Sequence, residues 1–257
     1  ILFCRDILHL KMKNGYTIKD AVLIINALIR VPCDGGMYAF SCEDLHMAVD
    51  KKISKKCITT LLNELFVIDA SSYKIDPFEL SQQDIQYRPI LKIKKNAYCM
   101  IEKSVCSTAF VECLLSAARE VVGSEKLEST IGKNTEKAAI QLISSLGITC
   151  KSGKYNGRTP TEEIDCSFEN DDELYFVECK KKSLTRNSRS GNDLNILEDI
   201  QKSFVDSLCQ ILKHEIHIIK NKEINFIDGS IEKISLRNKL ISRISLSLFD
   251  YGPISFT

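Results

Sequence analysis

The sequence predicts two domains, a mainly helical one over residues 1–123 and an α/β one with a mixed central sheet over residues 124–257. Three observations support this prediction. The 257 residues are enough for two ordinary domains, and the 44% hydrophobic and 27% charged residues are typical of a globular protein. The first half carries apolar residues at helical spacing. The second half adds segments in which apolar and polar residues alternate, as they do in strands.

Charge and cysteine content narrow the class of protein. Lys and Arg number 35 against 34 Asp and Glu, so net charge indicates no partner, and a nucleic-acid binder would have to concentrate its basic residues locally. The 11 cysteines are irregularly spaced and form no CxxC pair, which favours reduced, buried thiols such as Cys113, Cys166 and Cys209 over disulfides or structural zinc. His214 and His217 could share a metal, but a helix end with a pH-sensitive surface is the preferred interpretation.

Targeting signals are missing from the sequence. No run approaches the ~18 apolar residues of a membrane span, and no signal-peptide pattern is present. We therefore expect no membrane contact and a cytoplasmic location, or a nuclear one if the source is eukaryotic. Because the chain begins ILFCRD, without Met, we expect a piece of a longer protein. Homo-oligomer formation, further domains and protein partners stay open.

The first half opens with helical signals. Residues 17–30 carry Thr17 followed three residues later by Asp20, a capping pattern, and then an apolar body. Residues 41–50 and 54–66 predict two further helices, each opening with a Ser that could cap it. Two short helices across a tight turn resemble a helix-turn-helix, so a winged-helix-like domain stays open beside the preferred plain helical subdomain. The lysines between them are interpreted as a solvated face.

The remaining elements follow in order. Residues 89–102 predict a β-hairpin, and residues 103–122 predict an amphipathic helix that ends at Gly123. The polar stretch GSEKLEST is expected to connect the domains. Beyond it, the pattern predicts one helix, three strands, a long helix and two final strands, at residues 134–146, 148–152, 163–168, 173–180, 193–214, 223–228 and 240–248.

Two neighbouring predicted strands of the second half carry the residues that could take part in catalysis or metal binding. In TEEIDCSF, alternation separates Asp165 from the face that holds Ile164 and Cys166. In LYFVECKKK, alternation places Glu178 and Lys180 together on the face opposite Tyr175, Val177 and Cys179. A hairpin between the strands would bring Asp165 and Glu178 side by side, with Lys180 one step further.

Such a group of side chains suits phosphodiester hydrolysis. Two carboxylates at close range repel, and ionising both is costly unless a cation lies between them. Oxygen ligands of this kind suit Mg²⁺ or Mn²⁺, which can polarise a phosphoryl oxygen and lower the pKa of bound water. An adjacent lysine could orient that water and offset charge in the transition state.

The spacing Asp-(x)12-Glu-x-Lys on two strands resembles the PD-(D/E)XK nuclease superfamily. The resemblance covers residues 130–215 and reaches towards the strand at 240–248. It implies a restriction-endonuclease-like α/β/α core and a metal-dependent endonuclease that hydrolyses nucleic acid, DNA before RNA. The family's Pro before the Asp is here Ile164, a substitution common enough to weaken the match little.

The resemblance also implies roles for individual residues. Asp165, Glu178, the backbone carbonyl of Cys179 and an acidic residue on the preceding helix would hold the metal, and Lys180 would be catalytic. Glu136 fits the helical position, because it lies on the apolar stripe of its helix where a surface helix would rarely place an acid. The helix after the third strand often carries a catalytic Gln; Gln201 and Gln210 are candidates, and Gln210 is preferred.

A basic segment follows the motif. It holds Lys181, Lys182, Arg186 and Arg189 among Ser, Thr, Asn and Gly residues, and no acid occurs before Asp193. We expect a flexible loop that contacts the phosphate backbone of nucleic acid. A catalytically inactive nuclease-fold module that binds nucleic acid or a partner protein is the alternative function. The second alternative is a regulator whose helix-turn-helix-like first half carries its main function.

Overall fold

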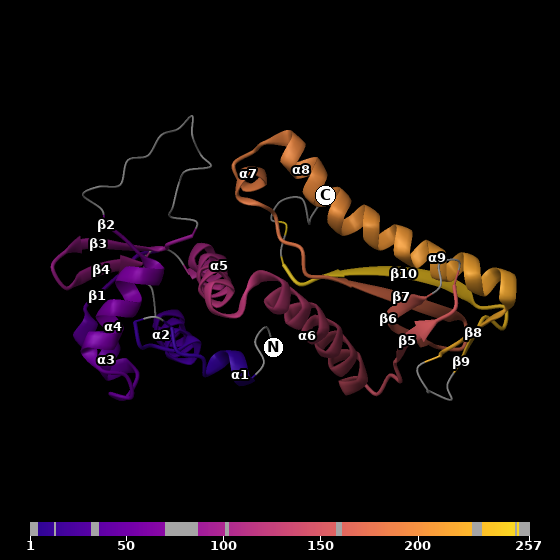
Figure 1. The fold of residues 1–257 in the computed structure, drawn as a ribbon, viewed down its shortest axis with the longest axis horizontal. Helices are drawn as coiled ribbons and strands as arrows, with labels where there is room; N and C mark the ends of the chain where they lie inside the picture. Colours follow the sequence, from indigo (N-terminus) through magenta and orange to yellow (C-terminus); the bar gives the residue numbers. More distant parts are fainter. Residues whose placement is uncertain are drawn as a thin grey trace. The chain divides into compact units, whose positions relative to one another are not determined.

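The computed structural model describes residues 5–12, 14–31, 36–69, 87–100, 103–157, 161–227, 233–249 and 251. Within them the chain is a mixed α/β protein made of two compact units that separate between Glu128 and Ser129 (Figure 1). No helix in these ranges is both long and apolar enough to cross a membrane. The ends of the predicted hairpin (101–102) and of the chain (252–257) lie outside the described residues.

The helices of the first unit begin where the sequence predicts. Thr17 and Ser41 each form a capping box with the Asp three residues later, and the Ser54 hydroxyl accepts from the N–H of Cys57. The helices are α1 (Arg5–Leu8), α2 (Ile18–Arg30), α3 (Cys42–Ala48), α4 (Lys55–Leu61), which continues into a π-helical turn (Leu62–Phe66), and α5 (Lys103–Val122).

The first unit also contains a four-stranded sheet of order β1-β4-β3-β2, so it is less helical than predicted. The strands are β1 (Tyr38–Phe40), β2 (Val67–Asp69), β3 (Ile90–Lys94) and β4 (Ala97–Met100). β3 and β4 form the predicted antiparallel hairpin, with Asn96 at a φ of 59° in its turn. β1 and β2 are too short to show an alternation pattern in the sequence.

The second unit is built around the central sheet that carries the motif. Its strand order is β10-β7-β6-β5; β5, β6 and β7 are antiparallel in succession, and β10 is parallel to β7. The strands are β5 (Lys151–Tyr155), β6 (Glu162–Glu169), β7 (Glu173–Lys180) and β10 (Leu240–Ser247). β8 (Glu223–Asn225) and β9 (Lys233–Ser235) form a separate antiparallel pair.

Helix α6 (Ser124–Ser145) precedes the sheet and starts well before the predicted helix at residue 134. The stretch GSEKLEST, within which the two units separate, is helical after its glycine rather than irregular. Gly123, at a φ of 85°, ends α5 as predicted. Leu127 and Ile131 give the early part of α6 an apolar face, since both are buried.

The predicted helix 193–214 runs further, as α8 (Asp193–Ile200), a π-helical turn (Gln201–Val205) and α9 (Asp206–Asn221). α9 lies along one face of the sheet, next to β7 and β10 (Figure 1). Its buried residues Ile211 and Ile218 join Phe176 of β7 in the hydrophobic core.

A bulge in β6 breaks the predicted alternation. Three residue steps on β6, from Ile164 to Ser167, match two steps on β5. Ile164 therefore joins Phe176 in the core under α9, whereas Cys166 keeps to the other face. The prediction that Ile164 and Cys166 share one face is wrong, because an extra residue in a strand reverses the parity beyond it. Asp165 lies within this bulge.

Candidate active site

The structure brings the predicted acidic residues and Lys180 together in one cleft of about 460 Å³ in the second unit. The lining residues come from one face of α6, from β6, from the end of β7, from the segment after β7, and from the long helix. The lining comprises Ser129, Gly132, Lys133 and Glu136 from α6, Asp165 from β6, Glu178, Cys179 and Lys180 from β7, and Lys181, Lys182, Lys202 and Gln210.

Asp165 and Glu178 both line this cleft, from the paired strands β6 and β7. The backbone N–H of Cys179 donates to Asp165 Oδ2 at 2.8 Å, which fixes the carboxylate across the hairpin. Glu178 is 4% exposed. Burial, together with the charge of Asp165, raises the pKa of Glu178 to about 7 although Lys180 opposes the shift. Burial also raises the pKa of Asp165, against the Cys179 N–H and Lys180.

Lys180 is held between β7 and α9. Its Nζ lies 3.0 Å from Glu178 Oε1 and also donates to the side-chain oxygen of Gln210. Of the two glutamines considered from the sequence, Gln210 therefore reaches the site. Gln201 is exposed and does not line the cleft.

Glu136 approaches the pair from α6. Burial raises its pKa first, and the charges of Asp165 and Glu163 raise it further, while Lys133 and Lys181 lower it. The third predicted acid thus shares the electrostatic environment of the other two. It lines the cleft from just past the middle of α6.

The cleft suits a divalent cation with few protein ligands. Among the described residues, no three side chains of His, Cys, Asp and Glu form a metal-binding group, so Glu136 does not complete a three-carboxylate site. Mg²⁺ characteristically takes one or two carboxylates and fills its other positions with water and substrate phosphate. Asp165 and Glu178 fit that pattern, because two desolvated carboxylates that resist joint ionisation are what a cation would stabilise. The carbonyl of Cys179, which also lines the cleft, could add one ligand.

The basic segment after β7 is partly helical, although its composition is that of a loop. It contains a short helix, α7 (Arg186–Arg189), capped by Thr185. Lys181 and Lys182 line the cleft, whereas Arg186 and Arg189 are not among its lining residues.

Two further lysines of the cleft were missed in the sequence. Lys133 lies one residue short of a full turn before Glu136 on α6, so the helical spacing that selects Glu136 could have selected Lys133 as well. Lys202 stands in the π-helical turn, where no sequence signal marks its direction.

The other candidate metal and thiol positions, at His214, His217, Cys113, Cys166 and Cys209, are not among the residues that line the cleft. The His214 ring lies 2.7 Å from the Tyr155 hydroxyl in the core, and burial lowers its pKa to about 4, so the interpretation of this residue as a surface group is wrong. The nine cysteines in the described ranges are free thiols, as predicted. Cys113 and Cys166 are buried, but Cys209 is exposed.

No protein-family model, no curated protein and no solved structure matches the chain.

Proposed function

We propose that the chain is a metal-dependent nuclease of the PD-(D/E)XK type that hydrolyses phosphodiester bonds of nucleic acid, DNA before RNA. The observation that carries the proposal is the shared cleft of Asp165, Glu178 and Lys180 on two adjacent strands. The order of elements agrees with it. A helix with an acid (α6) precedes three antiparallel strands, and a helix with a glutamine directed at the lysine (α9) follows them before the parallel strand β10.

Each side chain of the cleft has a role in this proposal. A divalent cation held by Asp165 and Glu178 would supply Lewis-acid activation of the phosphoryl group and of water. Lys180 is placed to orient the attacking water and to stabilise negative charge that develops on the phosphate. Gln210 fixes the Lys180 ammonium from the helix side, which keeps the lysine from folding back onto Glu178 alone.

The charge around the carboxylates favours a polyanionic substrate. Besides Lys180, four lysines line the cleft from three different elements: Lys133, Lys181, Lys182 and Lys202. Basic side chains that converge on an acidic, cation-binding centre can neutralise the phosphates on either side of the bond to be cut. A small uncharged substrate would gain nothing from them.

A cleavage assay tests the proposal. Supercoiled plasmid, linear duplex, single-stranded DNA and RNA are incubated with the protein in Mg²⁺, Mn²⁺ or EDTA. We expect cleavage that EDTA abolishes and that Asp165→Asn and Lys180→Met each reduce by about 100-fold or more. The matched control is Asp172→Asn, an exposed residue of the turn between β6 and β7.

Three outcomes are distinguishable. Metal-dependent cleavage that the two cleft variants lose, and the turn variant keeps, supports the proposal. Binding of nucleic acid by the wild-type protein without cleavage in any metal favours the catalytically inactive module instead. Cleavage by Asp165→Asn at the wild-type rate would mean that the activity belongs to another site or to a contaminant.

A further inference from the structure

Three consecutive lysines leave β7, and each is directed at a different acid. Lys180 pairs with Glu178. Lys181 lies against α6 near Glu136, and its aliphatic end passes within 3.7 Å of the position that a Cβ would take on Gly132. Lys182 pairs with Asp199 of α8, Nζ to Oδ1 at 3.0 Å. The three lysines form one basic run in the sequence, but in the structure each lies near an acid on a different element: β7, α6 and α8.

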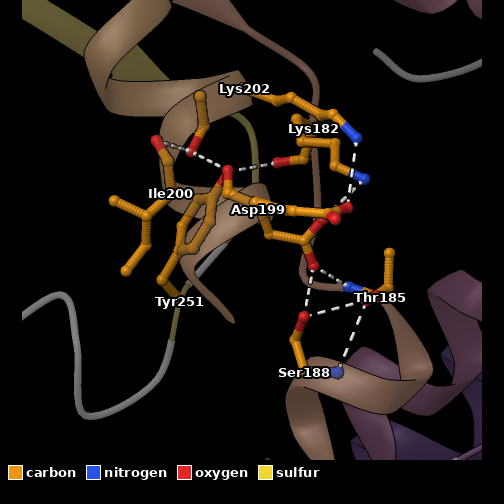
Figure 2. Close-up of polar contacts among 9 residues, drawn as sticks. Lys182, Thr185, Ser188, Asp199, Ile200, Lys202 and Tyr251 are labelled. Carbon is orange, nitrogen blue, oxygen red and sulfur yellow. Dashed lines mark hydrogen bonds and ion pairs between the residues drawn. The ribbon is translucent and has the colours of Figure 1, made fainter. Parts of the chain in front are cut away.

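Asp199 stands at the centre of a polar cluster that involves the segment after β7 (Figure 2). Its Oδ2 accepts the backbone N–H of Thr185 at 2.6 Å and the Ser188 hydroxyl at 2.5 Å. Asp199 is 2% exposed and Ser188 3%. Although burial alone would raise it, these hydrogen bonds and Lys182 bring the pKa of Asp199 to about 2. The carboxylate is thus ionised at every pH of interest.

Residues near the C-terminal end of the described chain also contact the segment after β7. The Tyr251 hydroxyl donates to the carbonyl oxygen of Lys182 at 2.7 Å (Figure 2). The centroid of the Tyr251 ring lies 5.1 Å from that of Phe204. At the start of the segment, the backbone N–H of Leu248 donates to the carbonyl oxygen of Lys180 at 2.8 Å. Backbone and side-chain contacts therefore hold residues 181–190, which we call the strap, from Lys180 through to α7.

If the strap only connected β7 to α8, a buried charge such as the Asp199 carboxylate would not be needed to hold it. Burying an ionised carboxylate carries a large desolvation cost, so a buried ion pair is weak evidence for a purely stabilising role. The groups that Asp199 holds begin two residues after Lys180, and two of the strap's lysines line the cleft. What the anchor fixes is therefore the placement of positive charge beside the proposed catalytic centre.

We propose that Asp199 is a positioning residue, which anchors the strap so that Lys181 and Lys182 stand in the cleft to receive phosphate groups of nucleic acid. This inference rests on the proposed nuclease function. It adds a residue outside the cleft on which substrate binding and turnover depend, although Asp199 itself does not touch the substrate.

Two substitutions separate the hydrogen bonds from the charge. Asp199→Ala removes both the acceptor for Thr185 and Ser188 and the partner of Lys182. Asp199→Asn keeps an acceptor oxygen for the strap but removes the negative charge. Asp193→Ala, on the exposed first turn of the same helix α8, is the matched control.

Limited trypsin digestion of the full chain reports directly on the anchor, because the strap contains Lys181, Lys182, Arg186 and Arg189. We expect fragments that end in the strap to form roughly tenfold faster or more from Asp199→Ala than from the wild type, because local opening exposes these bonds. Asp199→Asn and Asp193→Ala should be cut there at close to the wild-type rate.

Binding and turnover report on positioning, which a merely structural anchor would not change. In EDTA, the slope of log affinity for duplex DNA against log salt should fall by about 1 to 2 for Asp199→Ala and stay at the wild-type value or steepen for Asp199→Asn. In metal, kcat should fall roughly tenfold for Asp199→Ala, and Asp199→Asn should recover most of it.

The outcomes separate this inference from the proposed function. An active wild type with an Asp199→Ala variant of equal salt slope and equal kcat overturns the positioning role, even if trypsin shows a loosened strap. Equal trypsin susceptibility overturns the anchor itself. A wild-type protein that neither binds nor cuts nucleic acid contradicts the proposed function, and the positioning role with it.

Discussion

Glu178 is a carboxyl group whose surroundings oppose its own ionisation. It is almost fully buried, and the charge of Asp165 also opposes its ionisation, while Lys180 favours it. In the absence of a cation the folded chain therefore carries an unfavourable electrostatic interaction at neutral pH. Residues that lower stability in this way are commonly retained for the chemistry they perform.

Glu178→Gln should accordingly stabilise the metal-free protein while it abolishes cleavage. At pH 8 in EDTA we expect the free energy of unfolding to rise by about 1 to 3 kcal/mol, since one pKa unit corresponds to about 1.4 kcal/mol. Cleavage should fall by about 100-fold or more. Chemical denaturation and a plasmid assay measure the two effects. Glu173→Gln, at the opposite end of β7, should change neither.

The two glutamines of the long helix provide a matched comparison. Gln210→Ala removes the contact that holds the Lys180 ammonium from α9, so we expect kcat to fall roughly tenfold with little change in KM. Gln201→Ala alters an exposed side chain outside the cleft and should leave both constants unchanged. Equal effects of the two substitutions would show that Gln210 does not act through Lys180.

At the scale of the element, α6 contains a glycine in its interior that the helix does not need. Gly132 has a φ outside the left-handed region, and a Cβ there would meet only Lys181, at ordinary van der Waals distances of 3.7 and 3.8 Å. Gly132→Ala should therefore raise the free energy of unfolding by about 0.5 to 1 kcal/mol. Gly147→Ala, at a φ of +80°, should lower it instead. Thermal denaturation of both variants checks the sign.

Local pattern was enough to predict the direction of Glu178 and Lys180 on β7 and of Glu136 on α6. A strand of period two places Glu178 and Lys180 on one face, and the 3.0 Å ion pair between them confirms it. A helix of period 3.6 places Glu136 on the inward stripe, and it lines the cleft. Both predictions depend only on residues within one element, where spacing in sequence fixes direction in space.

The errors arose where distant residues decide the conformation. The bulge at Asp165 depends on how β6 pairs with β5, which the sequence of β6 alone does not show. The strap has the composition of a flexible loop, but Asp199, 14 residues after Thr185, anchors it. The residues after Gly123 look polar because their helix buries only a narrow apolar stripe, with Leu127 and Ile131 in it.

In the whole molecule, the residues that line the cleft run from Ser129 onwards and so belong to one compact unit. Two buried groups of that unit titrate in the same pH range with opposite consequences. His214 has its pKa lowered from 6.5 to about 4, and Glu178 has its pKa raised from 4.5 to about 7. The contributions of His214 and Glu178 to the pH dependence of stability in this unit should therefore oppose each other.

The sign of each contribution follows from proton binding. Below pH 6.5 the unfolded chain protonates His214 while the folded chain does not, so this contribution to stability falls as pH drops from 6.5 towards 4. Above pH 4.5 the unfolded chain releases the proton of Glu178 while the folded chain keeps it until about pH 7, so this contribution falls as pH rises. Asp199 adds stability that is lost only as pH falls from 3.8 towards about 2.

The wild-type unit in EDTA should consequently show little change in stability between pH 4.5 and 6.5. Glu178→Gln leaves the histidine contribution unopposed by Glu178, so its stability should rise with pH more steeply than that of the wild type across that range, by up to about 1.4 kcal/mol per pH unit. His214→Gln, which keeps a hydrogen-bonding group for Tyr155, should instead lose stability as pH rises to 7. Urea denaturation of the three proteins at half-unit pH intervals measures the slopes. Parallel slopes in the two variants would show that these groups do not titrate in the folded chain as their burial requires.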